Sequence, residues 1–151
     1  MPYKIHLEDP RIGFAAAHFI LEHEKCGRLH GHNYFVEVSV AGELDKDHMI
    51  IDYAILKNHL RQLTEKYDHK VMIPANAPNL KITRTKKGVQ LETNNKRWLF
   101  PEEDIVLLPL KATTSELLAK FLHQKLKEKW SQYEINVTIE EAPGARASYS
   151  D

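Results

Sequence analysis

The sequence predicts an α+β domain in which two helices cover one face of an antiparallel sheet of four strands. Two patterns predict it: apolar and polar residues alternate in four segments, and apolar residues recur three and four positions apart in two others. The helical segments lie between alternating segments at both ends of the chain, so we expect the helices to pack on one side of the sheet. A length of 151 residues suits a single domain, residues 1–151, with its own hydrophobic core.

Strands are expected at residues 3–8, 12–20, 33–41 and 134–141. The first two are separated by Asp9 and Pro10, which form a turn signal. A further short apolar segment, Ile105–Leu108, is a candidate strand before the second helix.

The two helices are expected at residue 53 to about residue 66 and from about 115 to 130. Asp52 precedes the first helix and has the side chain of an N-cap residue. Each helix carries an apolar stripe at helical spacing, which indicates one buried face.

Residues from about 74 to 104 form a peripheral excursion in this interpretation. They contain three prolines, and the segments Lys81–Thr85 and Gly88–Glu92 are able to pair as a hairpin. The sequence assigns the excursion no task.

Composition excludes several classes of partner. The 21 basic and 21 acidic side chains balance, so we expect neither nucleic acid nor an anionic membrane as a partner. No apolar segment approaches the roughly 20 residues that a membrane helix needs. The first residues lack the apolar core of a secretory signal, and a single cysteine, which cannot form an internal disulfide, suits a reducing compartment. A soluble cytoplasmic protein is therefore expected.

Three histidines predict a zinc site. His30 and His32 are separated by one glycine, so their side chains share a face if the strand that follows begins a little early. A hairpin would bring His18 of the preceding strand to the same face. Three imidazoles leave the fourth tetrahedral position of zinc open, as in catalytic sites. The plainer alternative is three unrelated surface or core histidines.

Cys26 lies four residues before His30 and beside Lys25 and Arg28. A lone cysteine is most often a small buried apolar residue, whereas neighbouring cations favour the reactive thiolate. It could also complete a four-ligand structural zinc site.

The segments Phe14–His18 and Lys25–Tyr34 resemble the 6-pyruvoyltetrahydropterin synthase family. The short spacing from Cys26 to His30 is most similar to the 6-carboxytetrahydropterin synthase branch, which supplies the 7-deazaguanine pathway to queuosine and archaeosine. The resemblance continues, in order, through Met49–Tyr53, Tyr67–His69, Thr114–Glu116 and the closing strand with Glu141.

The resemblance implies a tunnelling fold (T-fold), in which subunits join their sheets into a barrel. It implies a homo-oligomer, a trimer or a dimer of trimers, with active sites between subunits. The implied activity is zinc-dependent conversion of 7,8-dihydroneopterin triphosphate to 6-carboxy-5,6,7,8-tetrahydropterin, with release of acetaldehyde and triphosphate. The alternatives are 6-pyruvoyltetrahydropterin formation, which keeps the side chain, and a non-catalytic T-fold protein that binds metal or a purine.

The resemblance also implies roles for individual residues. Cys26 would be the general base that takes a proton from the substrate's side chain. Asp68 would fix the tautomer of His69, which would exchange protons with substrate or with Cys26. The plainer alternative for this pair is a solvated helix end.

Glu141 would anchor the pterin through charge-assisted hydrogen bonds. Its neighbour Glu140 points to the opposite face of the strand and is expected to be ordinary surface. Thr114 and Glu116 would contact substrate, although helix capping explains both residues equally well.

Overall fold

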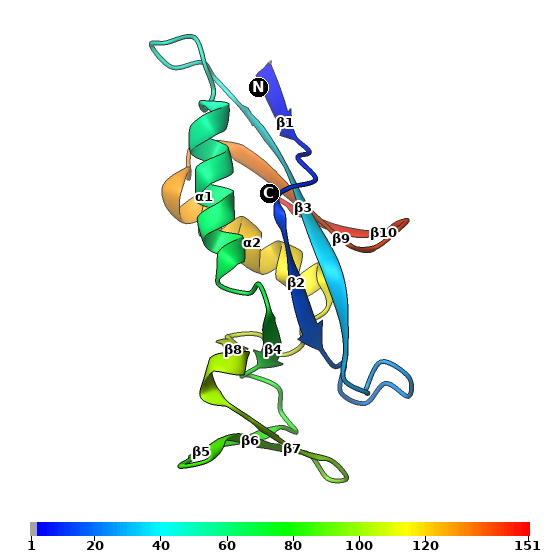
Figure 1. Cartoon of the computed structure of the whole chain (residues 1–151). Coiled ribbons are helices and arrows are strands. Elements are labelled where there is room, and N and C mark those ends of the chain that lie inside the picture. Colours follow the sequence, from blue (N-terminus) through cyan, green and yellow to red (C-terminus); the bar gives the residue numbers. More distant parts are fainter. Residues whose placement is uncertain (1–2) are drawn as a thin grey trace.

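A computed structural model describes residues 3–151; the first two residues of the N-terminal segment considered above lie outside this range. The main sheet has seven strands, in the order β10-β9-β3-β2-β4-β8, with β1 paired to β3 (Figure 1). Their bounds are β1 Tyr3–Leu7, β2 Gly13–His18, β3 His30–Gly42, β4 Lys70–Pro74, β8 Ile105–Leu108, β9 Glu134–Ala142 and β10 Ala145–Ser150. The α+β class is thus confirmed.

β3 is the longest strand and organises the sheet. Its first half pairs antiparallel with β2, and its second half pairs along the same edge with β1. Between β1 and β2 the chain makes a turn at Asp9, whose carbonyl accepts a hydrogen bond from the Ile12 N–H at 2.9 Å. The other edge of β3 pairs with β9.

The sheet is larger than the four antiparallel strands expected, and it is mixed. β4 pairs in parallel with both β2 and β8, and β10, where no strand was expected, folds back antiparallel on β9. β8 coincides with the candidate strand at Ile105–Leu108, whereas β4 was not expected and has only 5 residues, too few for a clear alternation.

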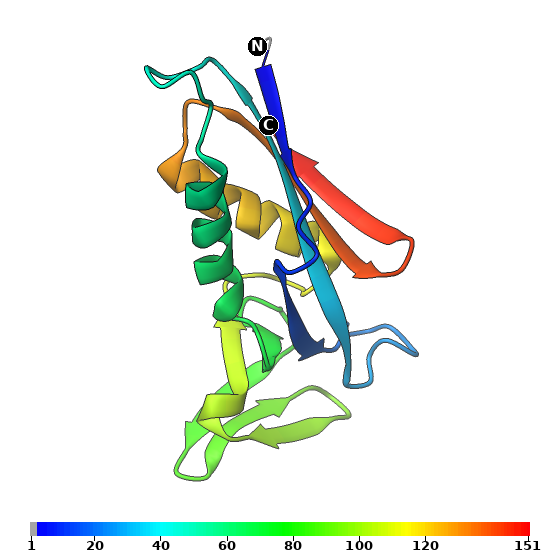
Figure 2. The same ribbon diagram turned by 45° about the horizontal axis from the view of Figure 1, so that its top comes forward.

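The two helices begin and end close to the expected residues: α1 is Tyr53–Glu65 and α2 is Ser115–Lys129. The Asp52 side chain accepts a hydrogen bond from the Ala54 N–H at 2.7 Å, as expected of an N-cap. Both helices lie against one face of the sheet (Figures 1 and 2), where their leucines join residues of β3 and β9 in the main core.

The excursion forms a separate sheet of β5 Lys81–Thr85, β6 Gly88–Glu92 and β7 Arg97–Phe100. β5 and β6 pair as the expected hairpin, and β7 extends it along β6. A second, smaller core holds this sheet against the end of β2 and against β4 and β8; its buried members are Phe19, Ile73, Val89, Leu91 and Ile105. Within residues 3–151, no helix is long and apolar enough to span a membrane.

Candidate metal and substrate site

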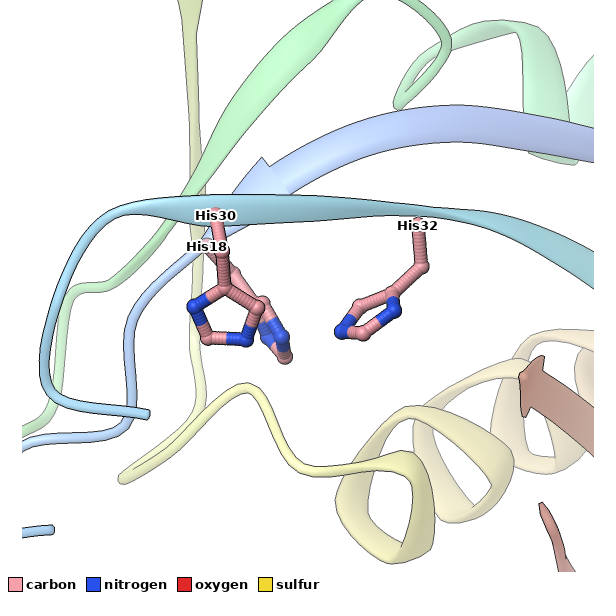
Figure 3. A group of neighbouring side chains, drawn as sticks. All are labelled: His18, His30 and His32. Carbon is pink, nitrogen blue, oxygen red and sulfur yellow. The ribbon is translucent and has the colours of Figure 1, made fainter. Parts of the chain in front are cut away.

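His18, His30 and His32 lie together at one end of the β2–β3 pair (Figure 3). β3 begins at His30, earlier than the sequence pattern indicated, and the register sets His18 opposite His30 and Ala16 opposite His32. Each ring offers one nitrogen as a metal-ligand atom, and these three nitrogens lie within 4.8 Å of one another. The ring centroids are 4.7 to 5.1 Å apart.

Two main-chain carbonyls orient the first two imidazoles. His18 Nδ1 lies 3.0 Å from the Thr113 carbonyl oxygen and 3.2 Å from its hydroxyl, and His30 Nδ1 lies 2.6 Å from the Arg28 carbonyl oxygen. Because a carbonyl only accepts, each Nδ1 carries the proton and donates it, which leaves Nε2 with a free lone pair. Metal-ligating histidines are typically oriented in this way.

A carboxylate oxygen faces the same centre. Glu141 Oε1 lies 3.4 Å from both His18 Nε2 and His32 Nε2, and the buried Tyr34 hydroxyl donates to it at 3.4 Å. His32 Nε2 is buried and makes no hydrogen bond to any described residue. Acceptor atoms that converge in this way repel one another unless a cation lies between them.

Burial lowers the pKa of His18 to about 4, against the opposing effects of its Thr113 bond and of Glu141. The imidazole is therefore neutral near pH 7, the form that binds a metal. Three convergent imidazoles with an open fourth position fit zinc, so the residues present suit the metal that the sequence predicts.

The register of β9 separates the two adjacent glutamates. Glu140 lies opposite Phe35 of β3 and accepts a hydrogen bond from Arg146 Nε at 2.8 Å on the face of the sheet away from the histidines. Glu141 follows on the other face, toward the imidazoles. The two side chains therefore divide as the alternation of the strand requires.

Cys26 lies in the loop between β2 and β3 and is partly buried. Its N–H donates to His23 Nδ1 at 3.0 Å, and its carbonyl accepts from the Ile20 N–H at 2.7 Å. Among residues 3–151, the cluster of potential metal ligands consists of the three histidines and does not include the Cys26 thiol. A four-ligand structural zinc site with Cys26 is therefore not assembled.

Asp68 and His69 form a pair between α1 and β4. Asp68 Oδ1 accepts the Ala15 N–H at 2.8 Å, and Oδ2 accepts from His69 Nδ1 at 2.8 Å. The bond from Ala15 holds the pKa of Asp68 below its usual value, with the His69 contacts adding to this and burial opposing it. The His69 side chain is 83% exposed. His69 and His32 line the same open cavity, whereas no hydrogen bond or ion pair between described residues joins the Asp68–His69 pair to Cys26 or to the three histidines.

Thr114 and Glu116 stand at the start of α2. The Thr114 hydroxyl accepts the Leu117 N–H at 3.4 Å, and Glu116 lies exposed in the first turn. Both positions fit capping and the helix dipole. Sequence reasoning missed Thr113, which orients His18. Nothing in the sequence pattern links two residues 95 positions apart.

Residues 10–151 match the sequence profile of a family described as 6-pyruvoyl tetrahydropterin synthase. A protein of Aquifex aeolicus named 6-carboxy-5,6,7,8-tetrahydropterin synthase is 30% identical over 138 residues, which cover 84% of this chain and 76% of that protein. A Methanocaldococcus jannaschii protein, provisionally given the same name, is 31% identical over 145 residues and covers 91% of this chain and 89% of its own length.

The fold also matches solved structures. The 6-pyruvoyl tetrahydropterin synthase of Plasmodium falciparum superposes with a TM-score of 0.90 at 28% identity, over 99% of this chain and 97% of that one. The Caenorhabditis elegans enzyme of the same name gives a TM-score of 0.65 at 24% identity, over 100% of this chain and 97% of its own. The T-fold expected from the sequence is thus confirmed for the single chain.

Proposed function

The chain belongs to the 6-pyruvoyl tetrahydropterin synthase family, and we propose that it is a zinc-dependent lyase acting on 7,8-dihydroneopterin triphosphate. It would release triphosphate and acetaldehyde and leave 6-carboxy-5,6,7,8-tetrahydropterin, in the 7-deazaguanine pathway. The observation that carries the proposal is the group of three convergent imidazoles at the end of β2 and β3, beside the loop that bears Cys26.

His18, His30 and His32 would hold the metal through Nε2, with His18 and His30 oriented by the main-chain carbonyls described above. Zinc bound there would supply a Lewis acid for oxygens of the substrate's side chain, which would make the neighbouring C–H bonds more acidic. Thr113 holds His18 at Nδ1 through its carbonyl and hydroxyl oxygens, and the Tyr34 hydroxyl lies 3.3 Å from both nitrogens of the same ring.

Cys26 would take the proton from the substrate's side chain as its thiolate. His69 would exchange protons with the substrate or with Cys26 through Nε2, because Asp68 occupies Nδ1. The exposure of His69 suits a group that meets substrate at a boundary between subunits, so we propose a homo-oligomer, a trimer or a dimer of trimers. A cytoplasmic location remains a prediction.

Glu141 would anchor the pterin, since a carboxylate accepts two parallel hydrogen bonds from a ring N–H and an amino group. Its position 3.4 Å from two of the imidazole nitrogens would place the pterin ring beside the metal. Thr114 and Glu116 remain candidates for substrate contact in addition to their positions at the helix start.

The test is anaerobic incubation of the zinc-loaded protein with 7,8-dihydroneopterin triphosphate, followed by the product's mass. The expected products are 6-carboxy-5,6,7,8-tetrahydropterin and acetaldehyde. A 6-pyruvoyl product would favour the alternative activity, 6-pyruvoyltetrahydropterin formation. The Plasmodium falciparum structure reported above is named for that activity. If no triphosphate is released, the protein is a non-catalytic binder and the proposal fails.

A further inference from the structure

The segment 20–28, called the Cys26 loop below, connects β2 to β3 in a compact turn. Its internal bonds include Ile20 N–H to the Cys26 carbonyl at 2.7 Å and Gly27 N–H to the His23 carbonyl at 2.9 Å. A Cβ on Gly27 would lie 2.3 Å from that His23 oxygen, so the turn tolerates no side chain there. The loop ends at Arg28, whose carbonyl orients His30.

The excursion touches this loop from outside the main sheet. Lys96 Nζ, in the turn between β6 and β7, donates to the Gly27 carbonyl at 2.9 Å. The turn itself is fixed, because the Thr93 N–H donates to the Lys96 carbonyl and the Lys96 N–H donates to the Thr93 hydroxyl. The lysine therefore reaches the loop from a rigid base.

Two further contacts join the same parts of the chain. Asn79 Nδ2 donates to Glu22 Oε1 at 2.6 Å, and the ring of Phe19, which follows His18, stacks on Trp98 of β7 at 4.5 Å and 5°. Between these contacts lies an open cavity of about 490 Å³. The loop is thus supported at separate points rather than by continuous packing.

We propose that the excursion is the support of the Cys26 loop and that Lys96 is a positioning residue for the Cys26 thiol. The inference rests on the proposed function, because it takes Cys26 as the base. Lys96 bonds the residue immediately after Cys26, so losing this bond frees the part of the loop that carries the thiol. A small displacement of a catalytic group is enough to reduce turnover, because proton transfer needs close alignment.

The test compares Lys96→Met with Lys96→Arg, which retains a donating cation, and with Lys86→Met in the opposite turn of the same sheet. Cys26 is the only cysteine, so alkylation of the zinc-loaded protein by iodoacetamide reports on this loop alone. We expect alkylation about fivefold faster in Lys96→Met, the size expected for losing one hydrogen bond of typical net strength. Lys96→Arg and Lys86→Met should match the parent.

Turnover gives the second measurement. In Lys96→Met, kcat should fall about fivefold to tenfold with KM nearly unchanged, because a mispositioned base affects the transition state more than substrate binding. Hydrogen exchange should rise in residues 20–28 and stay unchanged in α1 and α2, which checks that the variant is folded.

Equal alkylation rates in Lys96→Met and Lys86→Met would overturn the inference, and so would faster alkylation with unchanged kcat. If the parent itself turns over no dihydroneopterin triphosphate, the proposed function fails instead. The alkylation and exchange rates would then still decide whether Lys96 holds the loop.

Discussion

Replacing His32 by alanine gives the sharpest test of the metal site. His18 and His30 each donate to a main-chain carbonyl, so removing either ring also breaks a structural hydrogen bond. His32 Nε2 is buried without a hydrogen bond to a described residue. Its removal therefore costs the metal-free protein little beyond packing, and the effect measured is mainly loss of the metal.

The magnitude follows from linkage between binding and folding. Zinc at a thousandfold excess over its dissociation constant stabilises the folded chain by about 4 kcal/mol. For a chain of this length each kcal/mol shifts the melting temperature by roughly 2–4 °C. We therefore expect zinc to raise the melting temperature of the parent by about 8–16 °C and that of His32→Ala by far less.

The assay is calorimetry with zinc and with chelator, together with metal analysis of the purified proteins. In chelator, the parent and His32→Ala should melt within a few degrees of each other. His6→Ala, at an exposed histidine on β1, is the matched control and should respond to zinc like the parent. A parent that is indifferent to chelator, or a His32→Ala protein that retains a full equivalent of zinc, would refute the metal site.

Three further predictions concern the other residues of the site. Cys26→Ala should lower kcat by at least about 100-fold, the usual contribution of a general base, while zinc content stays at one equivalent; retained turnover would remove Cys26 from that role. Glu141→Gln should weaken binding of the pterin by about tenfold to a hundredfold, measured by titration with a substrate analogue, because a charged acceptor is lost. The folded-state pKa of Asp68 lies below its usual value, so its contribution to stability is present above that usual value and lost as pH falls through the folded one. Urea unfolding from about pH 5 to about pH 2 should show a shallower acid loss in Asp68→Asn, and equal slopes would contradict this.

The helices and the long strands could be predicted because their signals are local. The apolar spacing of α1 places Leu56, Leu60 and Leu63 on its buried side. Asp52 marks the start of the helix, because its side chain accepts the hydrogen bond of the Ala54 N–H. The histidine cluster could be predicted for the same reason, since alternation within one strand puts His30 and His32 on one face.

The rest depends on pairings between distant segments. β4 has no alternation, and it becomes a strand because β2 and β8 flank it on both sides. β10 follows a tight turn at Gly144, where φ is +81°, and its pairing with β9 gives order to a polar sequence. The supports of the site are main-chain carbonyls and a buried hydroxyl, which a residue pattern does not reveal.

Asp68 and His69 remain a prediction for a physical reason. His69 has φ of +59°, a conformation that costs a non-glycine residue about 1 kcal/mol or more. The surrounding bonds maintain it: the His69 N–H donates to the Ala15 carbonyl, and Asp68 bonds both Ala15 and the ring. A side chain that is firmly oriented and yet 83% exposed is accessible to a substrate, as its proposed role requires. In the proposed oligomer that substrate would be held partly by a neighbouring subunit, which is why the oligomer and the role of His69 stand or fall together.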